Sequence, residues 1–239
     1  MFGWMLLVSL LAGWLVNLVA DTAPERRSVR ETWLWAACQL PGRLPQRLGL
    51  STACATCPQQ RPWRYLLVWG ATLVLGWFAY QHLGFSLGGI ILAVQAWFFL
   101  AVAIIDLEHR RVLNNMLLPA VPVIVIFDLM TGLPSPTSAL LGALAGFGLF
   151  LLLALIRPGG IGMGDVKLAG VIGLATGFNG VIGAMLICIL TGGLAAVVIL
   201  LRNRTRHGKL TSGQTMAYAP YLVLGAWAAL YYGTAIWHF

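Results

Sequence analysis

Seven apolar runs, each about long enough to cross a membrane as a helix, make up most of this chain of 239 residues. A helix needs about 20 mainly apolar residues to span a hydrocarbon layer roughly 30 Å thick. The runs occupy residues 3–20, 65–83, 87–106, 112–131, 137–156, 179–201 and 214–236. A shorter helix is expected at 165–177. The fold is therefore predicted to be all-α and polytopic, with about eight transmembrane helices in a single integral membrane domain over 1–239.

Basic residues gather on one side of this expected bundle. When successive helices alternate in direction, all fifteen Lys and Arg residues fall on the same side. Under the positive-inside rule that side is cytoplasmic, so both termini are expected outside. This distribution accounts for the net charge of +8 without a nucleic-acid partner. The first run has no basic residue before it and no small-x-small cleavage site, so we expect a retained helix.

The one long connection, residues 21–63, is expected to be a cytoplasmic insert. It is rich in Arg, Pro and Thr and has no long apolar run. Three of the seven acids of the chain, Asp21, Glu25 and Glu31, belong to it and have arginines nearby. We expect these three acids to be solvated surface charges.

Three cysteines of the insert, Cys38, Cys54 and Cys57, are candidate metal ligands. Disulfides are disfavoured in the cytoplasm, where a CxxC pair such as "CATC" more often binds metal or has a redox role. A closed structural zinc site has four protein ligands. The insert has no histidine and no fourth cysteine, and Cys188 lies in an apolar run. Two interpretations stay open here, a zinc site and unliganded thiols.

Asp106 and Asp165 stand out among the acids. Each lies at the end of an apolar segment, and both are expected at the same depth in the membrane, near its cytoplasmic side. Asp106 closes the run "GGIILAVQAWFFLAVAIID", and Asp165 follows "RPGGIGMG". A charge at the centre of a membrane helix costs about 2.5–3.5 kcal/mol, so such residues usually mark function. The proline and four glycines prevent a continuous helix, and irregular backbone at this depth needs protein or a water-filled cavity around it. Gly162 and Gly164 also permit the close approach of a substrate strand.

Two neighbouring carboxylates can divide hydrolysis between them. The ionised one takes a proton from water, and the protonated one donates to the scissile carbonyl. Asp165 is expected at the positive N-terminal end of a helix and Asp106 at a negative C-terminal end. We therefore hypothesise that Asp165 begins as the base and Asp106 as the acid.

The two remaining acids are expected to be structural. Asp128 lies near the outer end of its run and is expected to reach the membrane interface. Glu108 has Arg110 and Arg111 close by and is expected at the cytoplasmic interface.

Several stretches together resemble one family. The stretches are "GMGDVKLAG" at 162–170, "AIIDLEHRRVLNNMLLP" at 103–119, "YAPYLVLGA" at 218–226 and "GWLVNLV" near the start. They resemble the type IV prepilin peptidases, or leader peptidases, which are bacterial GxGD-type membrane aspartic proteases. The resemblance spans nearly the whole chain, and its most specific part is the glycine-aspartate motif.

The resemblance implies a protease of the bacterial inner membrane. Its activity would be the cleavage of the basic leader of type IV prepilins or pseudopilins after a glycine, on the cytoplasmic side. Its partners would be the substrate helix and membrane lipid, and proteolysis would need no cofactor. The catalytic residues would be Asp106 and Asp165, with Gly162, Gly164 and Lys167 in support.

For longer members the resemblance implies a second activity. They methylate the new N-terminus with S-adenosylmethionine, an activity tied to an insert with four zinc-binding cysteines. Here the matching positions would be Cys38, Cys54 and Cys57, and the second CxxC is absent.

Three other interpretations stay open at this point. A presenilin-like intramembrane protease shares the glycine-aspartate motif, although Ile105 rather than tyrosine precedes Asp106. An archaeal preflagellin peptidase usually lacks the cysteine-bearing insert. An ion-coupled or proton-coupled transporter would use two membrane carboxylates and a broken helix, but the sequence has no inverted repeat to support it.

Overall fold

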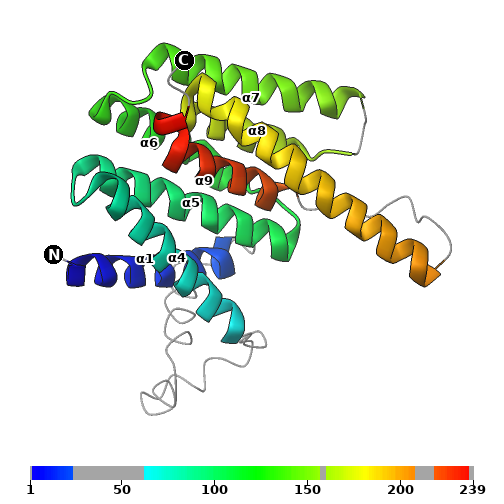
Figure 1. The fold of residues 1–239 in the computed structure, drawn as a ribbon, viewed down its shortest axis with the longest axis horizontal. Coiled ribbons are helices and arrows are strands. Elements are labelled where there is room, and N and C mark those ends of the chain that lie inside the picture. Colours follow the sequence, from blue (N-terminus) through cyan, green and yellow to red (C-terminus); the bar gives the residue numbers. More distant parts are fainter. Residues whose placement is uncertain (1, 24–61, 157–159, 208–217, 237–239) are drawn as a thin grey trace. The chain divides into compact units, whose positions relative to one another are not determined.

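The computed structural model describes residues 2–23, 62–156, 160–207 and 218–236, and its regular structure in these ranges is helical. The helices there are α1 (Phe2–Thr22), α4 (Pro62–Leu83), α5 (Leu87–His109), α6 (Asn114–Thr131), α7 (Pro136–Ile156), α8 (Met163–His207) and α9 (Ala219–Ile236) (Figure 1). Five of them are long and apolar enough to cross a membrane. The prediction of an all-α chain with several membrane-spanning helices is therefore confirmed in the described ranges.

Helix α8 covers two segments that the sequence predicted as separate helices, 165–177 and 179–201. Its backbone is non-helical at Gly177, where φ is 73° and ψ is −179°. This positive φ suits glycine, because a Cβ atom would be strained there. The break lies where the sequence separates the predicted helices 165–177 and 179–201. We refer to residues 163–176 as the first arm of α8 and to residues 178–207 as its second arm.

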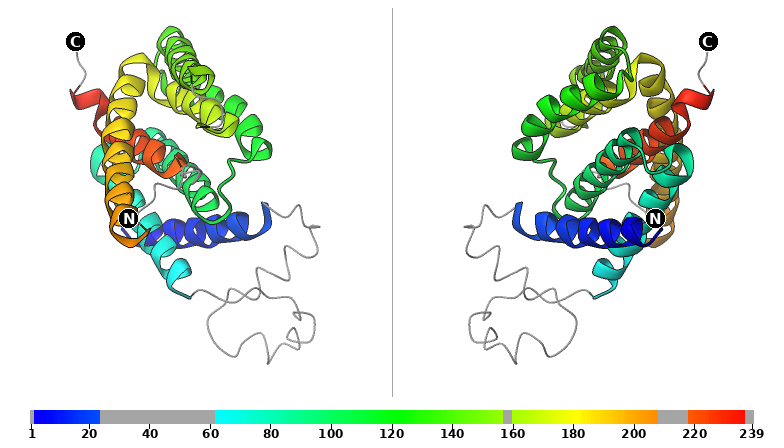
Figure 2. Two further views of the ribbon diagram at one scale, coloured as in Figure 1. Left: turned by 90° about the vertical axis from the view of Figure 1, so that its right-hand side faces the viewer. Right: turned by 90° about the vertical axis from the view of Figure 1, so that its left-hand side faces the viewer.

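The chain turns back at this break. A Cβ atom added to Gly146 of α7 would lie 2.3 Å from the Ala169 carbonyl oxygen and 3.3 Å from Val181 Cγ2. In one straight helix those two residues would be about 18 Å apart at 1.5 Å per residue. Both arms therefore meet beside Gly146, and α7 lies along α8 (Figure 2).

Glycines allow α7 and the first arm to touch backbone to backbone. A Cβ atom on Gly142 would lie 2.3 Å from the Gly173 oxygen, and one on Gly173 would lie 2.1 Å from the Gly142 oxygen. Gly142 and Gly146 are four residues apart, the small-xxx-small spacing that brings membrane helices close together. This contact fixes where the first arm, and thus Asp165, lies within the bundle.

Ser138 stabilises the break from the neighbouring helix. Its Oγ accepts a hydrogen bond of 3.0 Å from the backbone N–H of Phe178, the first residue of the second arm. We expect Ser138→Ala to lower the free energy of unfolding by about 1 kcal/mol, as removal of a helix N-cap does. Thermal unfolding in detergent measures this loss. Ser138→Thr keeps the hydroxyl and should restore most of the stability, and equal losses in both variants would contradict the capping role.

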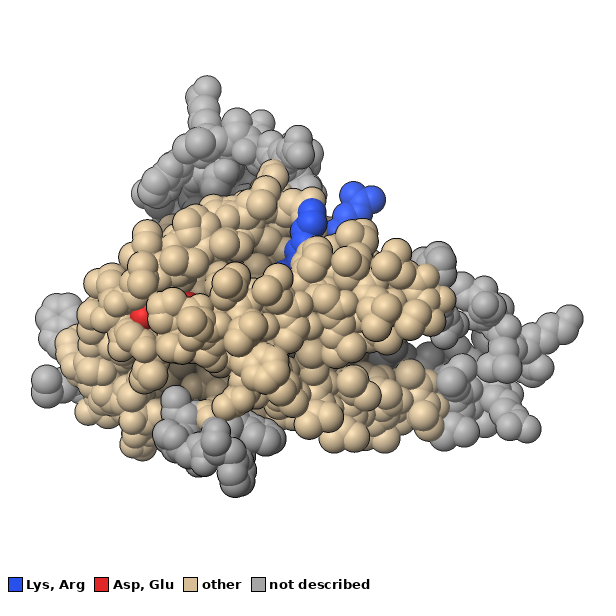
Figure 3. All heavy atoms as spheres, turned by 90° about the horizontal axis from the view of Figure 1, so that it is seen from above, with Lys and Arg blue, Asp and Glu red and all other residues tan. Residues whose placement is uncertain are grey.

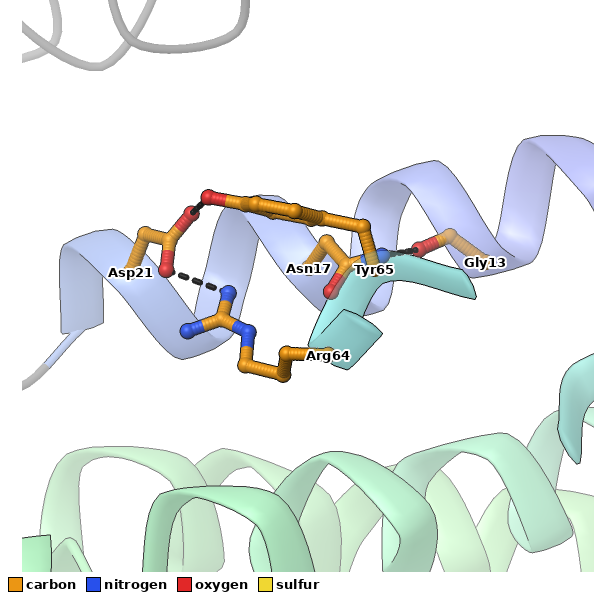
Figure 4. Close-up of polar contacts among 5 residues, drawn as sticks. All are labelled: Gly13, Asn17, Asp21, Arg64 and Tyr65. Atoms are coloured by element: carbon orange, nitrogen blue, oxygen red, sulfur yellow. Dashed lines mark hydrogen bonds and ion pairs between the residues drawn. The ribbon is translucent and has the colours of Figure 1, made fainter. Parts of the chain in front are cut away.

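The described helices form two compact units, Met1–Trp77 and Phe78–Phe239, and α4 is divided between them. In the first unit, α1 and α4 touch at Gly13, where a Cβ atom would lie 2.3 Å from Trp69 Cδ1 and 2.8 Å from Thr72 Oγ1. Figure 4 shows that Arg64 and Tyr65 of α4 both point at Asp21 of α1. The Arg64 guanidinium donates to Asp21 Oδ1, and the Tyr65 hydroxyl donates to Oδ2 over 3.2 Å.

The expectation of a solvated Asp21 is therefore wrong. Helix α1 continues through Thr22, and the Asp21 side chain is only 5% exposed. Since Asp21 is the first residue of the predicted insert and Arg64 directly follows its last, their ion pair joins the two ends of that insert. Nearly all of the insert lies outside the described residues, including Glu25 and Glu31.

Loss of the arginine should therefore destabilise the first unit. We expect Arg64→Met to cost about 3 kcal/mol, because removing one partner of a buried ion pair leaves the other charge uncompensated. Thermal unfolding in detergent, followed by tryptophan fluorescence, measures the loss. The double variant Arg64→Met/Asp21→Leu should recover part of it. A double variant less stable than Arg64→Met would contradict this account of the pair.

In the second unit α8 is the central element, since α6, α7 and α9 all pack against it while α5 packs mainly on α9. The buried core contains Phe99 and Val102 of α5, Val166 and Ile172 of the first arm, and residues of α9. Apolar side chains instead cover much of the outside, and few charges interrupt the described surface that Figure 3 shows. Such a surface is expected of helices that face lipid.

Candidate active site

Asp106 lies in the last turn of α5 and is only 3% exposed. Its Oδ2 accepts a hydrogen bond of 3.1 Å from the backbone N–H of Ala219, the first residue of α9. Helix α5 then ends at Arg110, which caps it in the left-handed conformation (φ 50°) and donates its N–H to the Asp106 carbonyl oxygen over 2.8 Å. These contacts hold the carboxylate against the start of α9.

Asp165 lies in the first turn of α8 and is 8% exposed. The chain is non-helical just before it, at 160–162, as the glycines predicted. The Gly162 carbonyl oxygen accepts the N–H groups of Asp165 (3.0 Å) and Val166 (3.3 Å), and these bonds begin the helix. Among the described residues, no group forms a hydrogen bond with the buried Asp165 Oδ1. A buried carboxylate oxygen without a partner is costly, which marks this atom for water or a ligand.

The fold brings the two carboxylates together. Asp106 in the last turn of α5 and Asp165 in the first turn of α8 lie near enough for their charges to interact. Asp106 faces the N-terminus of α9 as well as the C-terminus of its own helix. Asp165 also lies at a helix N-terminus, so the helix-end reasoning from the sequence does not distinguish the acid from the base.

Gly164 permits the approach that places the pair. A Cβ atom on Gly164 would lie 2.8 Å from Val112 Cβ and 3.1 Å from the Val112 oxygen, in the link between α5 and α6. The start of α8 can therefore lie against the segment that follows Asp106 only while residue 164 lacks a side chain. Gly162 is similarly restricted, since a Cβ atom there would lie 3.3 Å from Asp165 Oδ2.

Lys167 contacts another part of the candidate site. Its Nζ donates a hydrogen bond of 3.0 Å to Asn114 Oδ1 in the first turn of α6. The side chain is exposed, and its hydrogen bond is to the start of α6 rather than to either carboxylate. Lys167 therefore joins α6 to α8 at the end of the bundle where the aspartates lie.

Two neighbours of the pair were not predicted as site residues. One is the Ala219 N–H, which Pro220 could have indicated, because proline favours the first turn of a helix. The other is Cys188 of the second arm, which is buried and lies within electrostatic range of Asp165. No local sequence pattern indicates Cys188, because the turn at Gly177 alone brings it to Asp165.

The other candidates do not join this site. Asp128 lies in the last turn of α6 and is 7% exposed, and its Oδ2 has no partner in the described part of the chain. Cys38, Cys54 and Cys57 lie outside the described residues. Within the ranges that the structure describes, no three His, Cys, Asp or Glu side chains are placed to hold a metal ion.

Two buried, interacting carboxylates can carry out acid-base chemistry on water. One ionised oxygen can accept a proton from a water molecule, and the other carboxyl group can donate a proton to a carbonyl. The described residues thus contain the groups that metal-independent hydrolysis requires.

Comparisons with known proteins agree with this chemistry. Residues 93–197, which include both aspartates, match the type IV leader peptidase family. No solved structure matches the chain. The chain is 29% identical over 225 residues to the prepilin leader peptidase/N-methyltransferase of Pseudomonas aeruginosa, covering 92% of this chain and 74% of that protein.

Two further relatives carry the same name. The protein of Bacillus subtilis is 30% identical over 183 residues, which cover 77% of this chain and 72% of the relative. That of Neisseria gonorrhoeae is 29% identical, covering 84% and 71%. With this identity over more than two thirds of the Bacillus protein, the chain belongs to the type IV leader peptidase family.

Proposed function

We propose that this protein is a prepilin leader peptidase that cleaves the basic leader of type IV prepilins or pseudopilins after a glycine. Membership of the family and the names of its relatives support this function. The observation that carries it is the pairing of Asp106 and Asp165, two buried carboxylates from α5 and α8 at the ends of apolar helices.

In the proposed mechanism the carboxylates act together. Asp165 is the base, because its Oδ1 lacks a protein partner and is available to a water molecule. It takes one proton from that water, whose oxygen attacks the scissile carbonyl carbon while Asp106 donates a proton to the carbonyl oxygen. The C–N bond of the resulting tetrahedral intermediate then breaks, the proton held by Asp165 passes to the leaving amine, and a hydroxyl of the intermediate returns a proton to Asp106 as the carbonyl re-forms. The Ala219 N–H holds Asp106 in place for these steps.

The proposed orientation follows from the charges. The protein would span the bacterial inner membrane with about eight helices, its two α8 arms being counted separately. Arg110, Arg111 and Lys167, close in sequence to the aspartates, would face the cytoplasm under the positive-inside rule. The aspartates would then lie on the side of the membrane where a basic leader is retained. Glu108 is exposed at the same end of α5, in line with its expected interfacial position.

N-methylation of the new terminus is a second proposed step. The relatives are named N-methyltransferases as well as peptidases. In this chain the step would use S-adenosylmethionine, and Cys38, Cys54 and Cys57 would bind zinc. Both proposals can be tested by the zinc content of the purified protein and by the mass of the product.

The direct test reconstitutes the purified protein in proteoliposomes with a prepilin that has a basic leader and a Gly-Phe junction. Mass spectrometry should find a mature chain that begins at the phenylalanine, heavier by one methyl group if methylation follows. Intact prepilin beside a folded protein would overturn the peptidase proposal. A proton or cation flux through the same proteoliposomes would then favour the transporter interpretation.

A further inference from the structure

The helices that carry the two aspartates pack mainly on other helices rather than on each other. Helix α5, which ends just after Asp106, packs mainly on α9, whereas α8 packs on α6, α7 and α9. Helix α9 in turn lies against the second arm of α8, since a Cβ atom on Gly225 would lie 2.1 Å from the Ala184 oxygen. The first arm, which carries Asp165, therefore needs another connection to the side of the bundle that holds Asp106.

The link between α5 and α6 supplies that connection. Val112 of the link lies against Gly164, where a Cβ atom would come within 2.8 Å of Val112 Cβ. Directly after the link, Asn114 begins α6, and its Oδ1 accepts the hydrogen bond of 3.0 Å from Lys167 Nζ. Gly164 and Lys167 flank Asp165 in the sequence, so both contacts hold the start of α8.

The backbone of the link is held in an unfavourable conformation. Arg110 has φ 50° and ψ 40°, and it is the one non-glycine residue with a positive φ in the described ranges. This left-handed conformation is unfavourable for a residue that has a Cβ atom, and it persists where the surrounding contacts impose it. Helix α6 does not fix its own start with a cap, because Leu113 at the N-cap position forms no capping hydrogen bond with its side chain. The contacts with α8 therefore hold the link in place.

Helix stability does not explain the position of Lys167. This residue lies near the N-terminal end of α8, and its Nζ contacts the first turn of α6. Both places are at the positive pole of a helix dipole, where a cation is unfavourable. A long charged side chain on the surface also contributes little to the stability of a protein. The position of Lys167 is better explained by what its hydrogen bond connects, which is the start of α6 with the start of α8.

We propose that Asn114 is a positioning residue for the peptidase reaction, because the hydrogen bond that it accepts from Lys167 holds the link after Asp106 against the start of α8. The bond favours the arrangement in which the two carboxylates lie close enough to act on one water molecule. Asn114 acts through the link and does not touch the reacting atoms. This proposal rests on the peptidase function proposed above.

The first test is the variant Asn114→Leu, which removes the acceptor and keeps the approximate size of the side chain. We expect the kcat of prepilin cleavage to fall roughly fivefold, because one hydrogen bond no longer favours the productive arrangement. KM should stay unchanged, because Asn114 does not bind the substrate. The melting temperature in detergent should change little, because the bond is exposed.

The conservative variant Asn114→Asp separates positioning from a general disturbance of α6. Aspartate keeps an oxygen that can accept the bond from Lys167, so kcat should stay near the wild-type value. Lys167→Met should reproduce the loss seen in Asn114→Leu. The double variant should be no slower than either single variant, because both substitutions remove the same bond. Losses that multiply in the double variant would overturn the proposal.

Asn115→Leu is the matched control. Asn115 is the next residue of α6 and is also exposed, but it lies outside the bond with Lys167. Its substitution should leave kcat unchanged. An unchanged kcat in Asn114→Leu, or an equal loss in Asn115→Leu, would overturn the role of Asn114 while leaving the peptidase intact. Failure of the wild-type protein to cleave prepilin would instead count against the peptidase function.

Hydrogen exchange decides the proposal even without turnover. The backbone N–H groups of Met116 and Leu117 donate to the Leu113 carbonyl oxygen over 3.1 and 3.3 Å, so their exchange reports whether the start of α6 is held. In Asn114→Leu, mass spectrometry of the peptide that contains them should show exchange about fivefold faster than in the wild-type protein. In Asn115→Leu the exchange should stay at the wild-type rate. Equal exchange in Asn114→Leu and the wild-type protein would overturn the proposal that the bond holds this segment.

Discussion

Asp106→Asn and Asp165→Asn should each reduce prepilin cleavage by on the order of a thousandfold or more while leaving the protein folded. Asparagine keeps the size of the side chain but can neither take a proton from water nor donate one as a carboxylic acid. The double variant should be no slower than the slower single variant, because the two groups act as one unit. Cleavage rates from mass spectrometry, measured beside melting temperatures in detergent, test both statements.

Asp128→Asn is the matched control for this experiment. Asp128 is also a buried aspartate of a membrane-spanning helix, but no contact connects it to Asp106 or Asp165. Its substitution should leave cleavage within a few-fold of the wild-type rate. Substantial cleavage by a folded Asp165→Asn protein, or losses of equal size in all three variants, would contradict the assignment of the two aspartates.

Gly164→Val should cause the second-largest loss, about a hundredfold in cleavage rate. Its Cβ atom would lie 2.8 Å from Val112 Cβ and would push the link after α5 away from the start of α8. A displacement of about 1 Å in catalytic groups can cost this much, because the reacting geometry is lost. The steady-state rate of prepilin cleavage at saturating substrate measures the effect.

Gly148→Val is the control, because a Cβ atom at Gly148 of α7 meets nothing within 4 Å. It makes the same chemical change in an exposed helix position and should leave the rate unchanged. Full activity in Gly164→Val would show that the Val112 contact does not place the aspartates.

Much of the helical fold could be predicted from the sequence, because the apolar runs are long and their ends carry glycine, proline or charge. The run at 137–156 became α7 at Pro136–Ile156, and the expected boundary near residue 178 became the break at Gly177. Local composition determines such features. The start of α8 just before Asp165 was likewise predictable, because glycines end one segment and an acid begins the next.

The sequence did not predict contacts that depend on how helices pack. Asp21 appeared to be a loop charge because its partner Arg64 is 43 residues away. The position of Asp128 near the end of its apolar run could be predicted, but the packing that buries its side chain could not. The Ala219 N–H reaches Asp106 from a residue 113 positions later in the chain. Each of these depends on tertiary packing, which periodicity along one helix does not encode.

The central claim is that Asp106 and Asp165 act as one acid-base unit, and the pH dependence of kcat/KM for prepilin cleavage tests it most directly. We predict a bell-shaped profile, because at low pH neither carboxylate can accept a proton from water and at high pH neither can donate one. Both limbs should be lost from the residual activity of Asp106→Asn and Asp165→Asn. A rate that stays constant across the acid and neutral range in the wild-type protein would contradict the paired mechanism.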